Sequence, residues 1–268
     1  MSRILVPGHD PIRRSRRSLT IMIPHRNPCS WSAAAILLVV FLVLMTADRT
    51  ARAANTDVST FDPLVMYGSD IRFSVWRKDR RIGSHTVQFR RDGDLVDVQI
   101  DFRARVKFLG ITAYRFEYAS SSTWNGAALQ SLNASVNDDG TQAEVSARRF
   151  GGEVVVDGSG GLRRVAGALF PSNHWHPGII GETRVLNTLT GRLDSVSINA
   201  MGQERVETAH GYVMADRYLY TGDLHDVDVW YDAAGRWVKL RFLTKGGELI
   251  EYRCEKCRAS DGLAERTE

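Results

Sequence analysis

Proline is scarce in this chain after its first segment, and cysteine is scarce throughout. Only Pro63, Pro171 and Pro177 follow residue 53, and the 268 residues include three cysteines. Proline removes a donor from the hydrogen-bond ladder of a sheet, so its rarity favours continuous strands. Three cysteines are too few for the disulfide-dense class of small exported proteins.

The chain also has no excess of basic over acidic residues once its basic first segment, residues 1–53, is left out of the count. Residues 1–53 hold eight basic and two acidic residues, whereas residues 54–268 hold 27 basic and 29 acidic ones. A nucleic-acid-binding surface needs basic side chains to neutralise phosphates, so we expect no nucleic-acid partner. With 43% hydrophobic and 25% charged residues, the composition excludes disordered and multi-span membrane classes.

The long apolar run of the chain, residues 33–47, has fifteen residues without a charge. A membrane-spanning helix needs about 20. Arginines precede the run, and Ala51-Arg52-Ala53 follows it as a small-x-small cleavage site. The pattern predicts that residues 1–53 are a signal peptide cleaved before Ala54. The mature protein is then periplasmic or secreted, with no membrane span.

The leader leaves alternatives open. A retained N-terminal anchor is one of them, since the apolar run can be extended with imperfect residues. Arg16-Arg17 resembles a twin-arginine signal, but it lies far before the run. A start at Met22 instead of Met1 gives a conventional leader, and we favour that start with ordinary secretion. A lipoprotein is excluded because Cys29 precedes the apolar run.

The mature chain shows a period of two that is typical of strands. Six apolar residues alternate with polar ones over eleven positions: Val98, Ile100, Phe102, Ala104, Val106 and Phe108. Such alternation predicts a strand with one dry and one wet face. Short segments of the same kind recur, with turn signals such as Asp92-Gly93 between them. An antiparallel meander is the natural topology.

We therefore expect an all-β fold. It consists of one β domain at 67–257, after a tether at 54–66 and before a flexible C-terminal tail at 258–268. A long meander must protect its edges by closing into a barrel, folding as a sandwich, or curling into a half-barrel with a plug. Residues 171–187 are the least strand-like, so they are predicted to form a short loop or helix plug.

The last third of the chain resembles a known family. Asp228-Val229-Trp230-Tyr231-Asp232, followed by Gly235-Arg236-Trp237-Val238-Lys239, is similar to a signature of exported bacterial proteins catalogued as domains of unknown function. Three other features are similar: Arg81-Ile82-Gly83, the Asn173-to-Pro177 loop, and Leu186-Asn187 with Thr190-Gly191. The resemblance spans roughly Tyr67 to Tyr252. It implies a periplasmic β-protein, with a half-barrel like that of the lipoprotein carriers, and no known reaction.

Read physically, the signature predicts a hairpin. Trp230 and Tyr231 end one strand, Asp232 to Gly235 form the turn, and Trp237 begins the next strand. We expect Trp230 and Trp237 to pair across the two strands.

His174 and His176 are the pair of residues that most suggests a functional site. On an extended backbone they share a face and could ligate zinc or copper. A third ligand would have to come from His85, His210, His225 or Glu182, none of which lies at a recognisable spacing. In the alternative interpretation, Trp175 anchors the loop in the core while both histidines face water.

Cys254 and Cys257 are predicted to form a small disulfide in an oxidising compartment, with free thiols and a redox or metal centre as alternatives. Acidic pairs such as Asp226 and Asp228 are typical of the solvated face of an antiparallel sheet. No catalytic residue and no cofactor emerges from the sequence.

Aromatic residues are the strongest general feature, because 22 of them follow the leader. Most should be core, and some should line a concave apolar face. We expect a non-catalytic protein that binds an apolar or lipid-like ligand, or an envelope partner, with Trp175, Trp230 and Trp237 as ligand contacts. The alternatives are a metal-assisted enzyme centred on His174 and His176, and a structural scaffold in the envelope.

Overall fold

The computed structural model describes residues 61–108, 111–244 and 246–261. The predicted signal peptide, with Cys29 and the choice between Met1 and Met22, lies outside the described residues. So do residues 54–60 of the predicted tether and residues 262–268 of the predicted tail.

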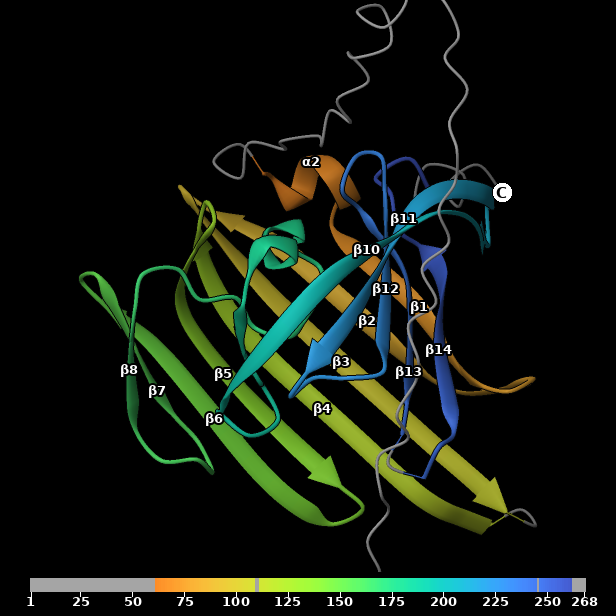
Figure 1. The fold of residues 1–268 in the computed structure, drawn as a ribbon, viewed down its shortest axis with the longest axis horizontal. Coiled ribbons are helices and arrows are strands. Elements are labelled where there is room, and N and C mark those ends of the chain that lie inside the picture. Colours follow the sequence, from red (N-terminus) through yellow and green to blue (C-terminus); the bar gives the residue numbers. More distant parts are fainter. Residues whose placement is uncertain (1–60, 109–110, 245, 262–268) are drawn as a thin grey trace, which may run out of the picture. The chain divides into compact units, whose positions relative to one another are not determined.

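Fourteen antiparallel strands form one sheet, so the predicted all-β meander is confirmed (Figure 1). The strands are β1 (Asp70–Arg77), β2 (Arg80–Asp92), β3 (Leu95–Phe108), β4 (Ile111–Asn125), β5 (Ala128–Asp138), β6 (Thr141–Phe150), β7 (Glu153–Asp157), β8 (Arg163–Ala166), β9 (Arg184–Leu186), β10 (Leu193–Thr208), β11 (Gly211–Gly222), β12 (Val227–Asp232), β13 (Trp237–Leu243) and β14 (Leu249–Lys256). Strands that follow each other in sequence are neighbours in the sheet, except β8 and β9, and the pairing of β1 with β14 joins the two halves. Strands β8 and β9 remain as the two ends, so the described sheet is an open half-barrel.

The two halves of the sheet form facing walls, as Figure 1 shows, with β2–β6 behind and β10–β14 in front. The alternation predicted for β3 holds along the described side chains: Val98 and Phe102 are buried, whereas Gln99 and Asp101 are exposed. Each wall therefore turns an apolar face inward. The core lies between the walls.

The curl of the sheet depends on Gly83 in β2. The pairing of β1 with β2 shifts register between Val75 and Trp76, and a bulge of this kind increases local twist. Beside the bulge, Gly83 pairs with Ala104, and a Cβ added to Gly83 would lie 1.9 Å from the carbonyl oxygen of Arg103. Only glycine fits this close approach of two backbones.

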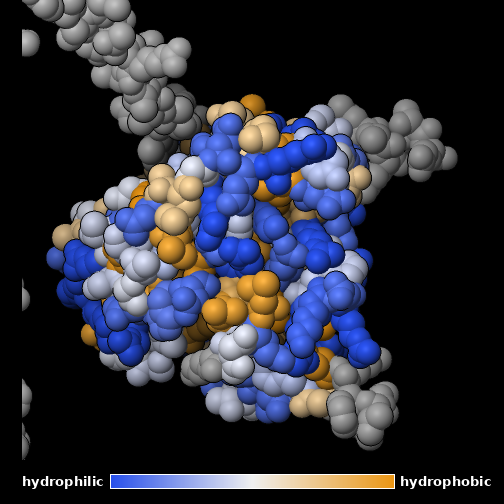
Figure 2. Space-filling view, turned by 45° about the vertical axis from the view of Figure 1, so that its right-hand side comes forward, coloured by the Kyte–Doolittle hydropathy of each residue, from blue (hydrophilic) through white to orange (hydrophobic). Residues whose placement is uncertain are grey.

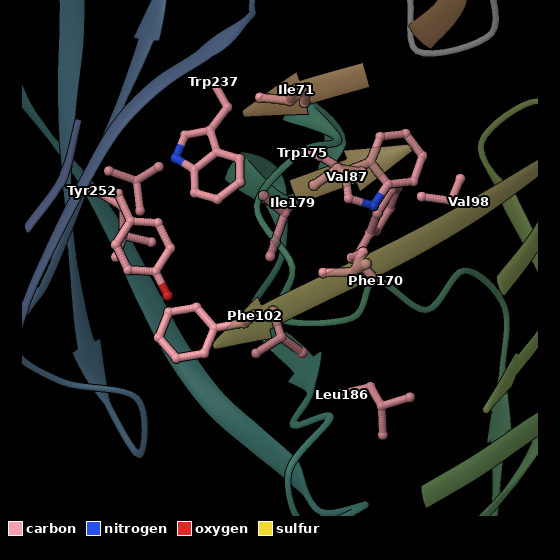
Figure 3. Close-up of a cluster of buried hydrophobic side chains, with 14 of the residues drawn as sticks. Ile71, Val87, Val98, Phe102, Phe170, Trp175, Ile179, Leu186, Trp237 and Tyr252 are labelled. Carbon is pink, nitrogen blue, oxygen red and sulfur yellow. The ribbon is translucent and has the colours of Figure 1, made fainter. Parts of the chain in front are cut away.

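Residues 169–187 fill one end of the space between the walls, so the predicted plug is confirmed (Figure 3). Pro177 begins the short 3-10 helix η2 (Pro177–Gly181), and the Nδ1 of His176 caps it by accepting from the Gly178 N–H. A single parallel bridge joins Pro171 to Leu186. The plug buries six apolar side chains of the core: Leu169, Phe170, Trp175, Ile179, Val185 and Leu186.

The described ends of the domain are packed rather than loose. The helix α2 (Pro63–Tyr67) is capped by Asp62, whose carboxylate accepts from the Leu64 N–H, and Phe61 belongs to the core. At the other end the buried Asp261 accepts from the Cys257 N–H. Packing therefore extends on both sides of the predicted boundaries at 67 and 257. Neither described helix is long and apolar enough to cross a membrane.

We predict that Gly83→Ala lowers the free energy of unfolding by at least about 2 kcal/mol, because the new methyl group collides with backbone that cannot move aside. Urea unfolding followed by circular dichroism measures the change. Gly152→Ala is the matched control, since nothing lies within 4 Å of a Cβ at that exposed turn. Equal stability of the two variants would contradict this role for Gly83.

Candidate functional site

Two buried tyrosine hydroxyls hold the plug in place. Tyr67 donates to the carbonyl oxygen of Trp175 at 3.0 Å and accepts from the backbone N–H of Trp237 at 2.9 Å. Tyr231 donates to the carbonyl oxygen of His174 at 2.7 Å. Burial raises the pKa of both hydroxyls above the ordinary value, so they stay protonated donors. Helix α2, the plug and β12–β13 are thereby joined at one point.

The plug turns its two histidines into different surroundings. The His174 ring lies 5.4 Å from that of Tyr220 and 5.9 Å from that of Trp237, and its backbone has a positive φ of 61°. The His176 ring lies 4.2 Å from that of Phe61. His176 is buried, so the interpretation in which both histidines face water is wrong. That interpretation failed because the plug enters between the walls instead of lying over them.

His85 of β2 is the third histidine of this region. Its ring is buried against four aromatic rings at 5.3–6.3 Å: Phe73, Phe102, Trp237 and Tyr252. His85 and His174 both pack on the ring of Trp237, at 5.4 Å and 5.9 Å. In the described part of the chain, no three His, Cys, Asp or Glu side chains are grouped so as to hold a metal ion.

These imidazoles are neutral and incompletely bonded. Burial lowers the pKa of His85 to about 3, that of His174 to about 4 and that of His176 to about 3. Within the described residues, no hydrogen-bond partner is present for either nitrogen of His85, for Nδ1 of His174 or for Nε2 of His176. An unsatisfied buried polar group costs about 1–3 kcal/mol. Such a cost is unusual for a core and characteristic of functional regions.

The three tryptophans predicted as ligand contacts lie in three separate places. Trp175 belongs to the plug, and Trp237 faces the interior beside His85. The expected pairing of Trp230 with Trp237 is wrong, because Trp237 lies opposite Tyr231 and a bulge follows. Trp237 thus shares the face of Tyr231, and Trp230, the residue next to Tyr231 in the strand, points to the opposite face.

Trp230 is buried on the outer face, under β10. Its Nε1 donates to Glu204 at 2.9 Å, and the cations of Arg217, Lys239 and Arg241 lie 5.1–5.7 Å from its ring centroids. Beside it, Asp228 accepts from Arg217 and Arg241 at 2.7 Å each. The interpretation of Asp228 as a solvated acid is therefore wrong, since the two arginines and β10 enclose it.

Cys254 and Cys257 are joined by a disulfide at the end of β14. The carbonyl oxygen of Cys254 accepts from the Ala209 N–H at 2.9 Å, and the carbonyl oxygen of Glu255 lies 2.9 Å from the Nε2 of His210. The tip of the β10–β11 hairpin thus docks on the segment that the disulfide closes.

The end of the half-barrel away from the plug is lined by a strip of four aromatic side chains. Phe102 of β3 lies 5.6 Å from Phe116 of β4 and 5.7 Å from Tyr252 of β14, and Tyr252 lies 6.3 Å from Phe242 of β13. Figure 3 shows Phe102 and Tyr252 approaching each other below Trp237. The strip joins the two walls across the interior.

Exposure increases along the inner face from the plug toward this strip. On the rear wall Val98 is fully buried, whereas Phe102 is 7% exposed and Phe116 is half-buried. On the front wall Trp237 is fully buried, and Phe242 is half-buried. The inner face is therefore fully covered beside the plug and partly exposed at Phe116 and Phe242.

Sequence reasoning missed the importance of His85 and Tyr67. His85 could have been found, because it precedes Val87 and Phe89 at the spacing of two that marks the dry face of β2. Tyr67 carries no such signal, since its partners are backbone groups more than 100 positions away in the sequence.

We predict that the protein loses stability as the pH falls from about 6.5 to about 3. The pKa of His85 is lowered on folding, so in this window the unfolded chain binds more protons than the folded one. In His85→Phe the stability advantage over the wild type should grow by about 1.4 kcal/mol per pH unit of acidification. Urea unfolding at several pH values measures this, with exposed His225→Phe as the control. An advantage that stays constant with pH would contradict the buried neutral imidazole.

Comparison with known proteins places this arrangement in a family. No curated protein matches the chain. Residues 73–255 match the family described as "Domain of unknown function (DUF6134)", and this segment includes the twelve complete strands β2 to β13, the plug and the aromatic strip. The match confirms the resemblance to a domain of unknown function that the hairpin signature indicated. The chain belongs to the DUF6134 family.

Proposed function

We propose that this protein is a non-catalytic binding protein that takes an apolar, lipid-like ligand into the open end of its half-barrel. The observation that carries the proposal is the aromatic strip on the inner face, whose members Phe116 and Phe242 are partly exposed. Such concave apolar surfaces, with few polar groups, are the usual setting for small-molecule binding.

The lining of this end fits a chain without charge. Apart from the neutral imidazole of His85, the buried side chains beside the strip include the apolar Ala104, Val136 and Ile250. At the rim, the Tyr114 hydroxyl donates to the carboxylate of Asp138 at 2.7 Å. A polar rim around an apolar interior favours a ligand with one polar end. Figure 2 shows that apolar surface reaches the exterior as a patch in an otherwise mostly hydrophilic face.

We also propose that the protein acts outside the cytoplasm. The support is the apolar run at 33–47 with the small-x-small site at 51–53, together with the disulfide between Cys254 and Cys257. Disulfides persist in oxidising compartments. A binding protein for lipid-like molecules in the periplasm would shield an acyl chain from water.

We predict that residues 54–268 bind a fatty-acid analogue carrying a dansyl fluorophore, and that Phe116→Ala and Phe242→Ala each weaken binding by about tenfold. Truncating a half-buried phenyl ring removes roughly 1–2 kcal/mol of apolar contact. Fluorescence titration gives the dissociation constants. Circular dichroism checks that the variants remain folded.

Phe150→Ala is the matched control, because Phe150 is 58% exposed and lies outside the strip. Its affinity should equal that of the wild type. Binding that no strip variant changes would overturn the proposed site. A wild type that binds no analogue, and that carries no lipid-sized adduct in native mass spectrometry, would favour an envelope scaffold instead.

A further inference from the structure

The outer face of the rear wall carries a trough that the proposed function does not use. A hollow of about 950 Å³ crosses β2 to β7, and a second of about 410 Å³ adjoins it. The two share Asp101, Ala119, Ser135 and Glu144, so they form one continuous depression. Its wall is the polar side of the same strands whose other side lines the core.

The trough is lined by rows of side chains that lie directly opposite one another on neighbouring strands. One complete row crosses six strands: Gln88, Gln99, Ser121, Asn133, Ser146 and Asp157. The adjacent row consists of Thr86, Asp101, Ala119, Ser135 and Glu144. Facing residues in such rows are close enough to contact one ligand together.

Small side chains create the hollow. Ala119 and Ser121 on β4, Ser135 on β5 and Ser146 on β6 leave the backbone accessible in the middle of the sheet. Elsewhere on the same face, long charged side chains cover the strands in ion pairs, such as Arg90 with Asp97 at 2.7 Å. The depression therefore exists because the side chains at these positions are small, whereas those around it are long.

The polar groups of the trough are available to a ligand. Within the described residues, the side chains of Gln88, Gln99 and Asn133 make no hydrogen bond to protein, although each faces other polar side chains across the strands. The carboxylates of Glu144 and Asp157 likewise have no ion-pair partner there, whereas Asp101 is bound by Arg103 at 2.9 Å. Amides, hydroxyls and free carboxylates together offer donors and acceptors, and Arg103, the cation that lines the second hollow, is paired with Asp101.

This chemistry selects the class of ligand. Free carboxylates repel polyanions, and a hydroxyl and amide surface gives an apolar chain nothing to pack against. A polyhydroxylated molecule matches, because each hydroxyl can donate to a carboxylate or an amide oxygen and accept from an amide N–H. Five inter-strand spacings give the row a length of about 24 Å, which suits an extended chain of several sugars.

We propose that the trough binds a neutral, linear oligosaccharide. The side chains of the row hydrogen-bond successive hydroxyl groups, and Glu144 and Asp157 accept the strongest of these bonds. Because the two rows contain no aromatic side chain, binding is in the millimolar range, and a longer glycan chain binds more tightly than a short one.

The test is an NMR titration of ¹⁵N-labelled residues 54–268 with maltohexaose, cellohexaose and chitohexaose. At least one of them should shift amide signals of β3 to β6 around the trough. Ser135→Lys, which fills the trough and lies opposite Glu144, should weaken this binding by about tenfold or more. Thr123→Lys is the matched control. It also places a lysine opposite a carboxylate, that of Asp97, but lies outside the trough and should bind like the wild type.

Shifts that Ser135→Lys and Thr123→Lys reduce equally would overturn the proposal. So would the absence of shifts with all three hexasaccharides, or binding of an oligolysine peptide in the trough while the hexasaccharides leave it unchanged. None of these three results bears on the apolar site, because the dansyl analogue reports the opposite face of the sheet.

Discussion

The structure depends on the insertion of the plug between the two walls. An open sheet of fourteen strands has a large apolar inner face and two free ends, and the plug covers part of that face. The Tyr67 hydroxyl fixes the insertion by bridging the plug backbone to β13. This bridge is buried, so losing either partner would leave a backbone group unsatisfied. The ligand site proposed for the interior lies on the part of the inner face that the plug does not cover.

The plug also explains the most costly feature of the core. It brings His174 toward His85, and neither imidazole can keep its full set of hydrogen bonds there. The cost is tolerable because both rings are neutral and packed among aromatic rings. The positive φ of His174 adds strain at the same place. The hydrogen bonds of the tyrosine hydroxyls and the aromatic packing thus stabilise the plug and offset the cost of the unsatisfied imidazole nitrogens.

Period-two patterning made much of the fold predictable from sequence. It identified the inner face of β3, and two prolines marked the plug. It could not predict that β1 pairs with β14, because that contact joins distant segments and includes a register shift at Phe73. Nor could it place Trp230 and Asp228, whose burial results from β10 crossing the outer face. The aromatic strip was foreseen only as a concave aromatic surface, since its members come from four strands.

One sheet therefore presents an apolar interior and a polar trough on opposite sides of the same strands. The central claim is that an apolar chain enters the interior at the end opposite the plug. Isotope-filtered NMR of the protein with a bound, unlabelled fatty acid tests this most directly. The account predicts nuclear Overhauser contacts from the acyl chain to the rings of Phe102, Phe116, Phe242 and Tyr252. Contacts confined to the outer face, or to Trp175 within the plug, would contradict it.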